Sequence, residues 1–287
     1  MKSKSRSWLN PFRRRYSEEI LSDGPYQTRH ENGQLKARGT LENGLEQGTC
    51  KRFYDTGILE FKGNYEQGRP HGLQEWHHQN GELRERKTYE QGRQTGPWEL
   101  YHPNGQLRSK GCFVDEKREG PFEVFYNNGK PRSKGSHSNN ERDGAYESYF
   151  ENGKLESKGT FSNGRKEGSW EEFHDNGQLK HFGSYRGGHP DGPQQWYFDN
   201  GQLEVSGEYD NNKQTGIFEE YWRDGLLAVR ESYTNGVKDG PYESYHENGR
   251  MKARGTFKTG VLHGSYALFT EDGQLKESGL YQEGLAQ

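Results

Sequence analysis

The chain has 287 residues, of which 27% are apolar and 13% aromatic. Soluble domains usually contain about 45–50% apolar residues on a count that also includes glycine, so this composition excludes a thick, closed core. The formal net charge of −3 provides no basic field to attract nucleic acid. Cys50 and Cys112 lack metal or redox spacing, and no apolar run approaches the length of a membrane span. We therefore expect a soluble, unsecreted, cytoplasmic protein.

Residues 1–23 are predicted to form a basic N-terminal tail. Residues 2–15 contain six basic side chains and no acidic one. Such a tail could bind weakly to a membrane surface or to a partner. Alternatively, it is a disordered leader, which Pro11 keeps from becoming helical. Residues 16–23 could add a capping strand, since Asp23 matches the last position of the repeat that follows.

Residues 24–287 show a period of 24 residues without insertion or deletion. With Gly24 as repeat position 1, glycine occupies positions 1 and 10 in all eleven repeats, position 16 in nine and position 21 in eight. These positions hold 39 of the 40 glycines, and positions 3, 6 and 18 hold 26 of the 38 aromatic residues. Self-similarity of this kind is the signature of a repeat architecture. We therefore predict eleven contiguous 24-residue units.

Each unit is predicted to be a β-hairpin. Positions 9 and 10 read Asn-Gly in eight repeats, which predicts a two-residue type I′ turn with positive φ at both residues. Positions 20 and 21 provide a second, weaker turn. The segments between the turns have strand lengths, and no helix tolerates this glycine spacing. The expected fold is all-β, an elongated antiparallel β-meander solenoid of eleven hairpins with about 22 strands.

The two-residue turn also predicts the strand pairing. Position 8 would face 11, 7 would face 12, 5 would face 14, 4 would face 15 and 3 would face 16. The ring at position 3 then covers the bare glycine at position 16, as in Trp98 and Gly111. Positions 4 and 15 place glutamate opposite lysine or arginine, as in Glu99 and Lys110. Positions 3, 7, 12 and 18 would share one face, with position 6 on the other unless a bulge moves it.

The pattern G-x-aromatic-x-N-G-x-x-x-G-x-aromatic-x-x-aromatic-x-x-N-G runs from Gly159 to Gly177. It recurs from Tyr233 to Gly249, where Glu231 stands in place of the first glycine. This pattern resembles the MORN-repeat variant found in bacterial proteins of the YwqK antitoxin-like family. The resemblance covers the whole repeat array. It implies a β-meander without catalysis and a role as an antitoxin or immunity protein that binds a cognate toxin.

No group of residues with catalytic or cofactor-binding character stands apart from the repeat. Five of the eleven histidines share position 7, but adjacent repeats are separated by roughly 9.6 Å, whereas zinc ligands lie about 2 Å from one shared ion. Most carboxylates occupy positions 4, 8, 19 and 24 as surface or turn residues, and none forms an isolated acid–base pair. We therefore expect no enzymatic activity, no metal and no cofactor.

Departures from the repeat pattern are the best candidates for partner binding, because repeat proteins use their pattern positions for stacking. Tryptophan replaces the usual polar or aliphatic residue at position 5 in two repeats, and residues 196–229 are predicted to form an apolar patch. Such patches favour interaction sites; alternatively, this patch is a locally thicker core near Glu231. The candidate partner-binding residues are Trp76, Trp196, Val205, Trp222 and Val229.

Three functions compete at this stage. The first is an antitoxin or immunity-type protein, monomeric on its own, that binds a toxin through one long face. The second is a structural scaffold, associated with a membrane through the basic tail. The repeats themselves carry 34 basic and 40 acidic residues and would not attract anionic lipid. The third, a carbohydrate-binding or carbohydrate-degrading surface, ranks last because paired catalytic carboxylates are missing.

Overall fold

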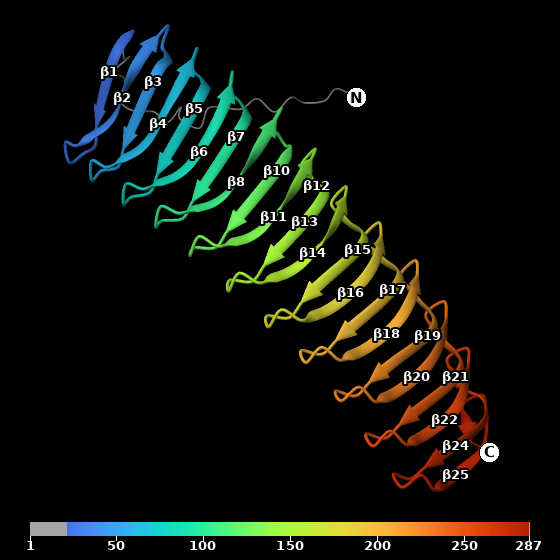
Figure 1. Ribbon diagram of the computed structural model, residues 1–287. Helices are drawn as coiled ribbons and strands as arrows, with labels where there is room; N and C mark the ends of the chain where they lie inside the picture. Colours follow the sequence, from blue (N-terminus) through green and yellow to red (C-terminus); the bar gives the residue numbers. More distant parts are fainter. Residues whose placement is uncertain (1–21, 287) are drawn as a thin grey trace, which may run out of the picture. The chain divides into compact units, whose positions relative to one another are not determined.

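The computed structural model describes residues 22–286, so the basic segment 2–15 and nearly all of the predicted cap at 16–23 lie outside the described residues. It divides into two units, Met1–Gln94 and Thr95–Gln287. Each unit is an open antiparallel meander in which consecutive strands lie side by side (Figure 1). The described part of the chain contains no helix that could span a membrane.

Unit 1 contains six complete strands and the start of a seventh. Its strands are β1 (Gly24–Arg29), β2 (Leu35–Glu42), β3 (Leu45–Phe53), β4 (Leu59–Glu66), β5 (Arg69–His77), β6 (Leu83–Glu90) and β7 (Arg93–Tyr101), which belongs to unit 2 from Thr95 onward.

Unit 2 contains the remaining strands. They are β8 (Leu107–Val114), β9 (Lys117–Arg118), β10 (Gly120–Phe125), β11 (Pro131–Ser138), β12 (Glu141–Arg142), β13 (Gly144–Tyr149), β14 (Leu155–Ser162), β15 (Arg165–Phe173), β16 (Leu179–Arg186), β17 (His189–Tyr197), β18 (Leu203–Asp210), β19 (Lys213–Tyr221), β20 (Leu227–Thr234), β21 (Val237–Tyr245), β22 (Met251–Lys258), β23 (Val261–Leu262), β24 (Gly264–Phe269), β25 (Leu275–Gln282) and β26 (Leu285–Ala286). Residues 22–286 thus form 26 strands rather than about 22, because three strands are divided in two and a short last strand is added.

The first turn of the hairpin differs from the predicted type I′ turn. In the first repeat the Gly33 N–H donates to the His30 carbonyl and the His30 N–H donates to the Gln34 carbonyl, each at 2.9 Å. Gly33 has a φ of 84°, whereas Asn32 keeps a negative φ. This is a three-residue loop, a type I turn closed by a left-handed glycine. The type I′ prediction was wrong because Asn-Gly suits both turns; here Asn32 Oδ1 accepts from the Gln34 N–H at 3.0 Å.

The type I′ turn occurs at positions 20 and 21 instead. Asn43 and Gly44 both have positive φ, 52° and 72°, as that turn requires. The side chain at position 24 of the preceding repeat caps the equivalent turns. Asp143 Oδ2, for example, accepts from the Asn163 N–H at 3.1 Å. The position 24 carboxylates are therefore turn residues, and each joins two neighbouring repeats.

The predicted pairing of positions 3, 4 and 5 with 16, 15 and 14 is confirmed, for instance in Trp98 opposite Gly111. A bulge follows, so that Tyr101 at position 6 is opposite Leu107 at position 12. Position 7 then faces position 11 across the three-residue loop. The predicted pairings of 7 with 12 and of 8 with 11 were therefore wrong, because the loop contains one residue more than the sequence pattern indicated.

The two faces of each meander carry different side chains. We call the side with positions 3, 5, 14, 16 and 18 the ring face, and the side with positions 4, 6 and 15 the charged face. Position 6 lies on the charged face, since the Tyr101 hydroxyl donates to Glu99 Oε2 at position 4 (2.6 Å). A bulge is present, as the sequence allowed, and the ring still points to the face opposite position 3.

The ring face holds most of the buried side chains. Trp170 at position 3 is 2% exposed and meets Phe161 at position 18 edge to face, with ring centroids 5.0 Å apart. The bare glycines at position 16 let these rings settle on the main chain; a Cβ on Gly111 would lie 2.9 Å from the Trp98 ring. Rings that cover glycines replace the second layer that a sandwich would supply.

The charged face carries a ladder of ion pairs. Arg230 at position 15 contacts Glu219 of its own repeat at 2.8 Å and Glu243 of the following repeat at 3.5 Å. Lys158 contacts Glu171 of the following repeat at 2.9 Å. The predicted glutamate–cation register is thus present and continues from repeat to repeat. Each exposed pair contributes only about 0–1 kcal/mol, so the ladder specifies register more than stability.

Position 7 ties each hairpin to the next. His30 Nε2 lies 2.8 Å from the Phe53 carbonyl, and His174 Nε2 lies 2.8 Å from the Tyr197 carbonyl. Because a carbonyl can only accept, each ring carries its proton on Nε2. The Tyr54 hydroxyl donates to the equivalent carbonyl. The position 7 histidines therefore have a structural role between repeats.

We predict that Gly111→Ala destabilises strands β7 and β8 within unit 2 by about 1–3 kcal/mol, because its Cβ would overlap the Trp98 ring. Gly255→Ala is the matched control. It makes the same change at the same repeat position, but the nearest atom, Tyr266 Cβ, is 3.8 Å away. Amide hydrogen exchange of the flanking strands measures both effects; equal exchange rates in the two variants would contradict the packing role of the bare glycine.

Candidate functional site

A hollow of about 350 Å³ opens on the ring face over strands β17 to β20. Its lining residues are Trp196, Glu204, Val205, Tyr209, Gln214, Phe218, Glu220 and Tyr233. Phe218 is 6% exposed, whereas the Glu220 side chain is exposed. The hollow therefore combines a buried ring with an acidic group that is open to solvent.

The structure brings only part of the predicted patch together. Trp196 and Val205 are cross-strand partners, as predicted, and both line the hollow. Glu220 is the partner of Val205 on one side and of Val229 on the other, so a carboxylate interrupts the apolar row. Val229 lies outside the lining.

Trp222 lies in the turn between β19 and β20, also outside the hollow. Its indole Nε1–H is buried and finds no acceptor within residues 22–286. The Trp222 side chain is half-buried. Trp222 is therefore a neighbour of the hollow along the chain and not one of its walls.

Trp196 is packed on one side and open on the other. Its ring stacks on His181, with centroids 4.8 Å apart and an interplanar angle of 28°. His181 is 5% exposed, and its Nε2 lies 2.9 Å from Gln194 Oε1. Position 3 of this repeat holds Gln194 instead of a ring. The packed rings are Trp196 at position 5 and His181 at position 14 of the preceding repeat.

Trp76 in unit 1 has the same surroundings as Trp196. It packs on Phe61 at a centroid distance of 5.2 Å, beside the buried Gln74. Unlike Trp196, it has a lysine of its own chain nearby, since Lys87 Nζ lies 6.0 Å from the ring centroid. Each position 5 tryptophan therefore packs on one side against the ring at position 14 of the preceding repeat.

The rings of the hollow form a fixed group. Phe218 meets Tyr209 at 5.6 Å and Tyr233 at 5.1 Å, both edge to face. The Tyr233 hydroxyl donates to Glu231 Oε2 at 2.7 Å. Burial and this hydrogen bond raise the pKa of Tyr233 well above its usual value, so the hydroxyl stays neutral. The Glu204 and Glu220 carboxylates of the lining, together with the faces of these rings, favour the binding of a cation over that of an anion.

The ionisable residues of the lining are of two types only. The lining contains no histidine, cysteine or lysine; its ionisable residues are Glu204, Tyr209, Glu220 and Tyr233. Within residues 22–286, no three His, Cys, Asp or Glu side chains are arranged to hold a metal ion. The geometry suits binding of a ligand by shape and charge.

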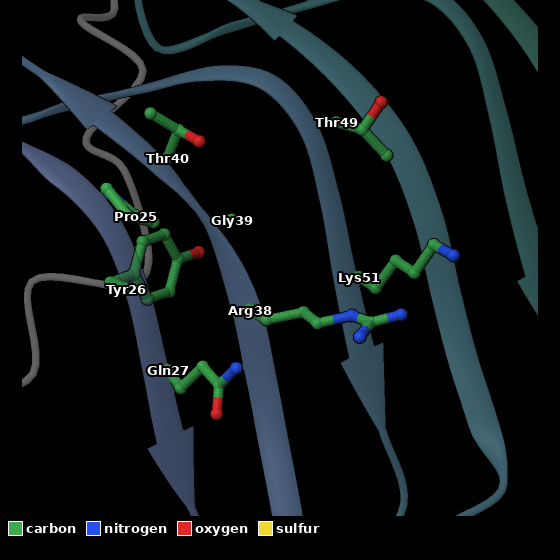
Figure 2. Close-up of a pocket in the computed structure, with 8 residues that line it drawn as sticks. All are labelled: Pro25, Tyr26, Gln27, Arg38, Gly39, Thr40, Thr49 and Lys51. Atoms are coloured by element: carbon green, nitrogen blue, oxygen red, sulfur yellow. The ribbon is translucent and has the colours of Figure 1, made fainter.

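A second hollow, of about 650 Å³, lies over β1 to β3 in unit 1 (Figure 2). Figure 2 shows the Tyr26 ring beside Gly39, and the Arg38 and Lys51 side chains along neighbouring strands. Arg38 and Lys51 are cross-strand partners on the charged face. Here position 4 carries lysine instead of glutamate, so neither cation has a carboxylate partner among the described residues. This hollow is shallow and basic.

Comparison with known families identifies the repeat. Nine segments match the MORN repeat variant: residues 22–43, 46–67, 70–91, 94–115, 118–139, 142–163, 166–185, 190–211 and 238–259. Together they cover well over half of the chain. The chain belongs to the MORN repeat variant family. MORN repeats are a non-catalytic repeat type that generally binds proteins or membranes. Residues 212–237, which supply half of the hollow's lining, fall outside the matched segments.

No curated protein is significantly similar to the chain. Among solved structures, it is similar to the crystal structure of TcdB2-TccC3, with 12% identity, a TM-score of 0.19 and coverage of 90% of this chain and 18% of that one. The TcdB2-TccC3-Cdc42 structure gives 12% identity, a TM-score of 0.20 and coverage of 89% and 16%. The MORN repeat chain thus spans less than a fifth of the length of these structures.

Sequence reasoning missed most of the hollow's residues. Tyr209, Phe218 and Tyr233 look like ordinary pattern rings, and Gln214 and Glu220 look like surface residues. One signal was available: glutamate occurs at position 5 only as Glu172 and Glu220. This glutamate indicates a site only when positions 5 and 23 are known to meet on the ring face.

We predict that His181 makes unit 2 less stable in acid. Burial lowers the pKa of His181 below its ordinary 6.5, even though the Gln194 hydrogen bond and Glu172 act in the opposite direction. The unfolded chain therefore binds the proton first. The stability associated with neutral His181 is fully present above pH of about 6.5 and is lost as the pH falls below that value.

His181→Phe should reduce this loss, because Phe61 shows that a phenyl ring fits the equivalent place beside Trp76. The measurement is urea unfolding at about pH 7 and about pH 5, with tryptophan fluorescence as the signal. If the variant loses as much stability as the wild type on acidification, the role of His181 is contradicted.

Proposed function

We propose that the protein binds a partner protein through the ring face of unit 2, at the hollow over β17 to β20. The observation that carries this proposal is the lining itself. It offers a half-buried Trp196, a group of rigid rings and an exposed Glu220 in one place. Tryptophan and tyrosine are among the residue types enriched at the centres of protein interfaces.

The region around the hollow also departs from the family pattern, which supports the hollow as the binding site. Residues 212–237 are unmatched although the 24-residue period continues through them. The strand pairing here is the same as elsewhere. The fold therefore does not account for the altered side chains, whereas a specific partner would.

Trp196→Ala should weaken capture of a protein from native cell extract by about tenfold or more, because it removes the largest ring at the edge of the hollow. The matched control is Tyr197→Ala, which removes the neighbouring ring on the charged face, where the Tyr197 hydroxyl donates to Gln195. Both variants should keep the β-sheet circular dichroism of the wild type. Equal binding by wild type and Trp196→Ala would exclude the hollow as the interface.

We further propose that the partner is a toxin and that the chain acts as an antitoxin or immunity protein, in the cytoplasm. The support is the resemblance of the repeats to the YwqK antitoxin-like family. The experiment is co-expression of the chain with the protein encoded beside its gene. Growth should be arrested by that protein alone and restored by the chain; arrest in both cases would contradict an antitoxin role.

Binding to an anionic surface is a second candidate, favoured by the unpaired Arg38 and Lys51 in unit 1. Flotation with phosphatidylserine vesicles tests it. If this candidate is correct, the double variant Arg38→Gln, Lys51→Gln should no longer float, because about 1 kcal/mol of attraction is lost for each cation near the surface. Flotation that is unchanged in the double variant would exclude this hollow as the cause.

A further inference from the structure

Lys166 lies in a cage that its own chain builds. Its Nζ is 4.4 Å from the Trp170 ring centroid and 4.9 Å from the Tyr185 ring centroid. It also donates to Glu172 Oε1 at 2.9 Å. Ring faces and a carboxylate both attract an ammonium group. A left-handed glycine, Gly168, with a φ of 67°, lies between Lys166 and Glu172 on β15 and turns the chain so that the two side chains meet.

The hollow in unit 2 is the same cage two repeats later. The residues 48 positions after the two rings and the carboxylate of the Lys166 cage are Phe218, Tyr233 and Glu220. The backbone register is also the same at both places, with position 14 opposite position 5 and position 18 opposite position 23. The lysine itself is replaced by the neutral Gln214. The cage has therefore lost its internal cation.

Phe218 and Tyr233 meet each other edge to face at 5.1 Å, whereas their counterparts Trp170 and Tyr185 both lie against Lys166 Nζ. The ring contact with position 18 of the preceding repeat keeps its geometry. Trp170 meets Phe161 at an interplanar angle of 75°, and Phe218 meets Tyr209 at 79°. The Glu220 carboxylate is exposed and makes no hydrogen bond or ion pair with any residue that the structure describes. Lys238, the cross-strand partner of Tyr233, is paired with Glu231, so no ammonium group of the described chain pairs with Glu220.

Two further substitutions give the hollow an apolar wall. In the Lys166 cage, the places of Trp196 and Val205 are taken by Ser148 and Ser157, whose hydroxyl groups bond to each other at 2.8 Å. Trp196 and Val205 replace this polar pair by an apolar wall beside the rings. The methylene chain of a lysine packs well on such a wall while its charged end stays near solvent.

We propose that this hollow binds a lysine side chain of the partner protein, with the ammonium group against Glu220, Phe218 and Tyr233 and the methylene chain along Trp196 and Val205. The assignment rests on the proposed protein-binding function and names the chemistry that the partner presents. Lys166 shows within the same chain how the bound group sits.

The first test returns the cation to the cage. In Gln214→Lys, treatment with a carbodiimide should couple the new amine to Glu220, because the reagent removes the carboxylate oxygen as a urea while an amide bond forms. The native pair of Lys166 and Glu172 provides the positive control in the same sample. Coupling at Lys166 without coupling at position 214 would overturn the equivalence of the two cages.

The second test uses N-acetyl-lysine N-methylamide as the probe and the Trp196 indole N–H resonance as the signal. The lysine probe should bind about tenfold more tightly than N-acetyl-norleucine N-methylamide, which lacks the charge. Glu220→Gln should weaken it by about fivefold, and Gln214→Lys should abolish it. Gln94→Lys is the matched control, because it makes the same change at position 23 where position 5 is Leu100; it should leave binding unchanged.

Equal binding of the two probes, or undiminished binding of the lysine probe to Gln214→Lys, would overturn the proposal. Binding of the captured partner protein to each variant distinguishes this outcome from failure of the proposed function. If the partner binds Gln214→Lys as tightly as it binds the wild type, the lysine assignment is wrong while protein binding stands. If the wild type captures no protein, the proposed function fails, and the assignment to a partner's lysine fails with it.

Discussion

Contact between a ring and a bare glycine is the constraint on which this structure depends. A meander without a second layer can bury apolar area only against its own main chain. Glycine at position 16 leaves that main chain uncovered, so that a ring such as Trp98 or Trp170 reaches it. The rings at positions 3 and 18 then cover one another along the array. Any insertion would separate ring from glycine, which explains the unbroken 24-residue period.

The sequence predicted the register near this contact and failed away from it. Trp98 opposite Gly111 followed from the position of the turn, and the pairing of glutamate with lysine at positions 4 and 15 agreed with it. The turn at Asn32 and Gly33 did not follow, since the same dipeptide fits two loop lengths that differ by one residue. The hollow depends on the meeting of positions 23 and 5, which are brought together only by the left-handed glycine between them. No periodic pattern reveals that contact.

The residues that break the pattern are of two kinds. Gln74 and Gln194 replace rings at position 3, but Phe61 and His181 restore the packing from position 14. These exchanges keep the core intact and belong to the fold. Gln214 is different, because Glu220 forms no ion pair among the described residues, whereas the equivalent Glu172 is paired with Lys166. A missing internal partner is therefore a better indicator of a binding site here than an additional tryptophan.

The proton chemical shifts of the position 16 glycines test the central claim most directly. A ring lying flat over a glycine shields its Hα protons, so Gly111, Gly135 and Gly207 should resonate upfield of their ordinary range. Gly255, whose three nearest neighbours at the Cβ site include no ring atom, should not. Ordinary shifts at all four glycines would contradict the account, because the rings would then lie elsewhere and the array would need another source of burial.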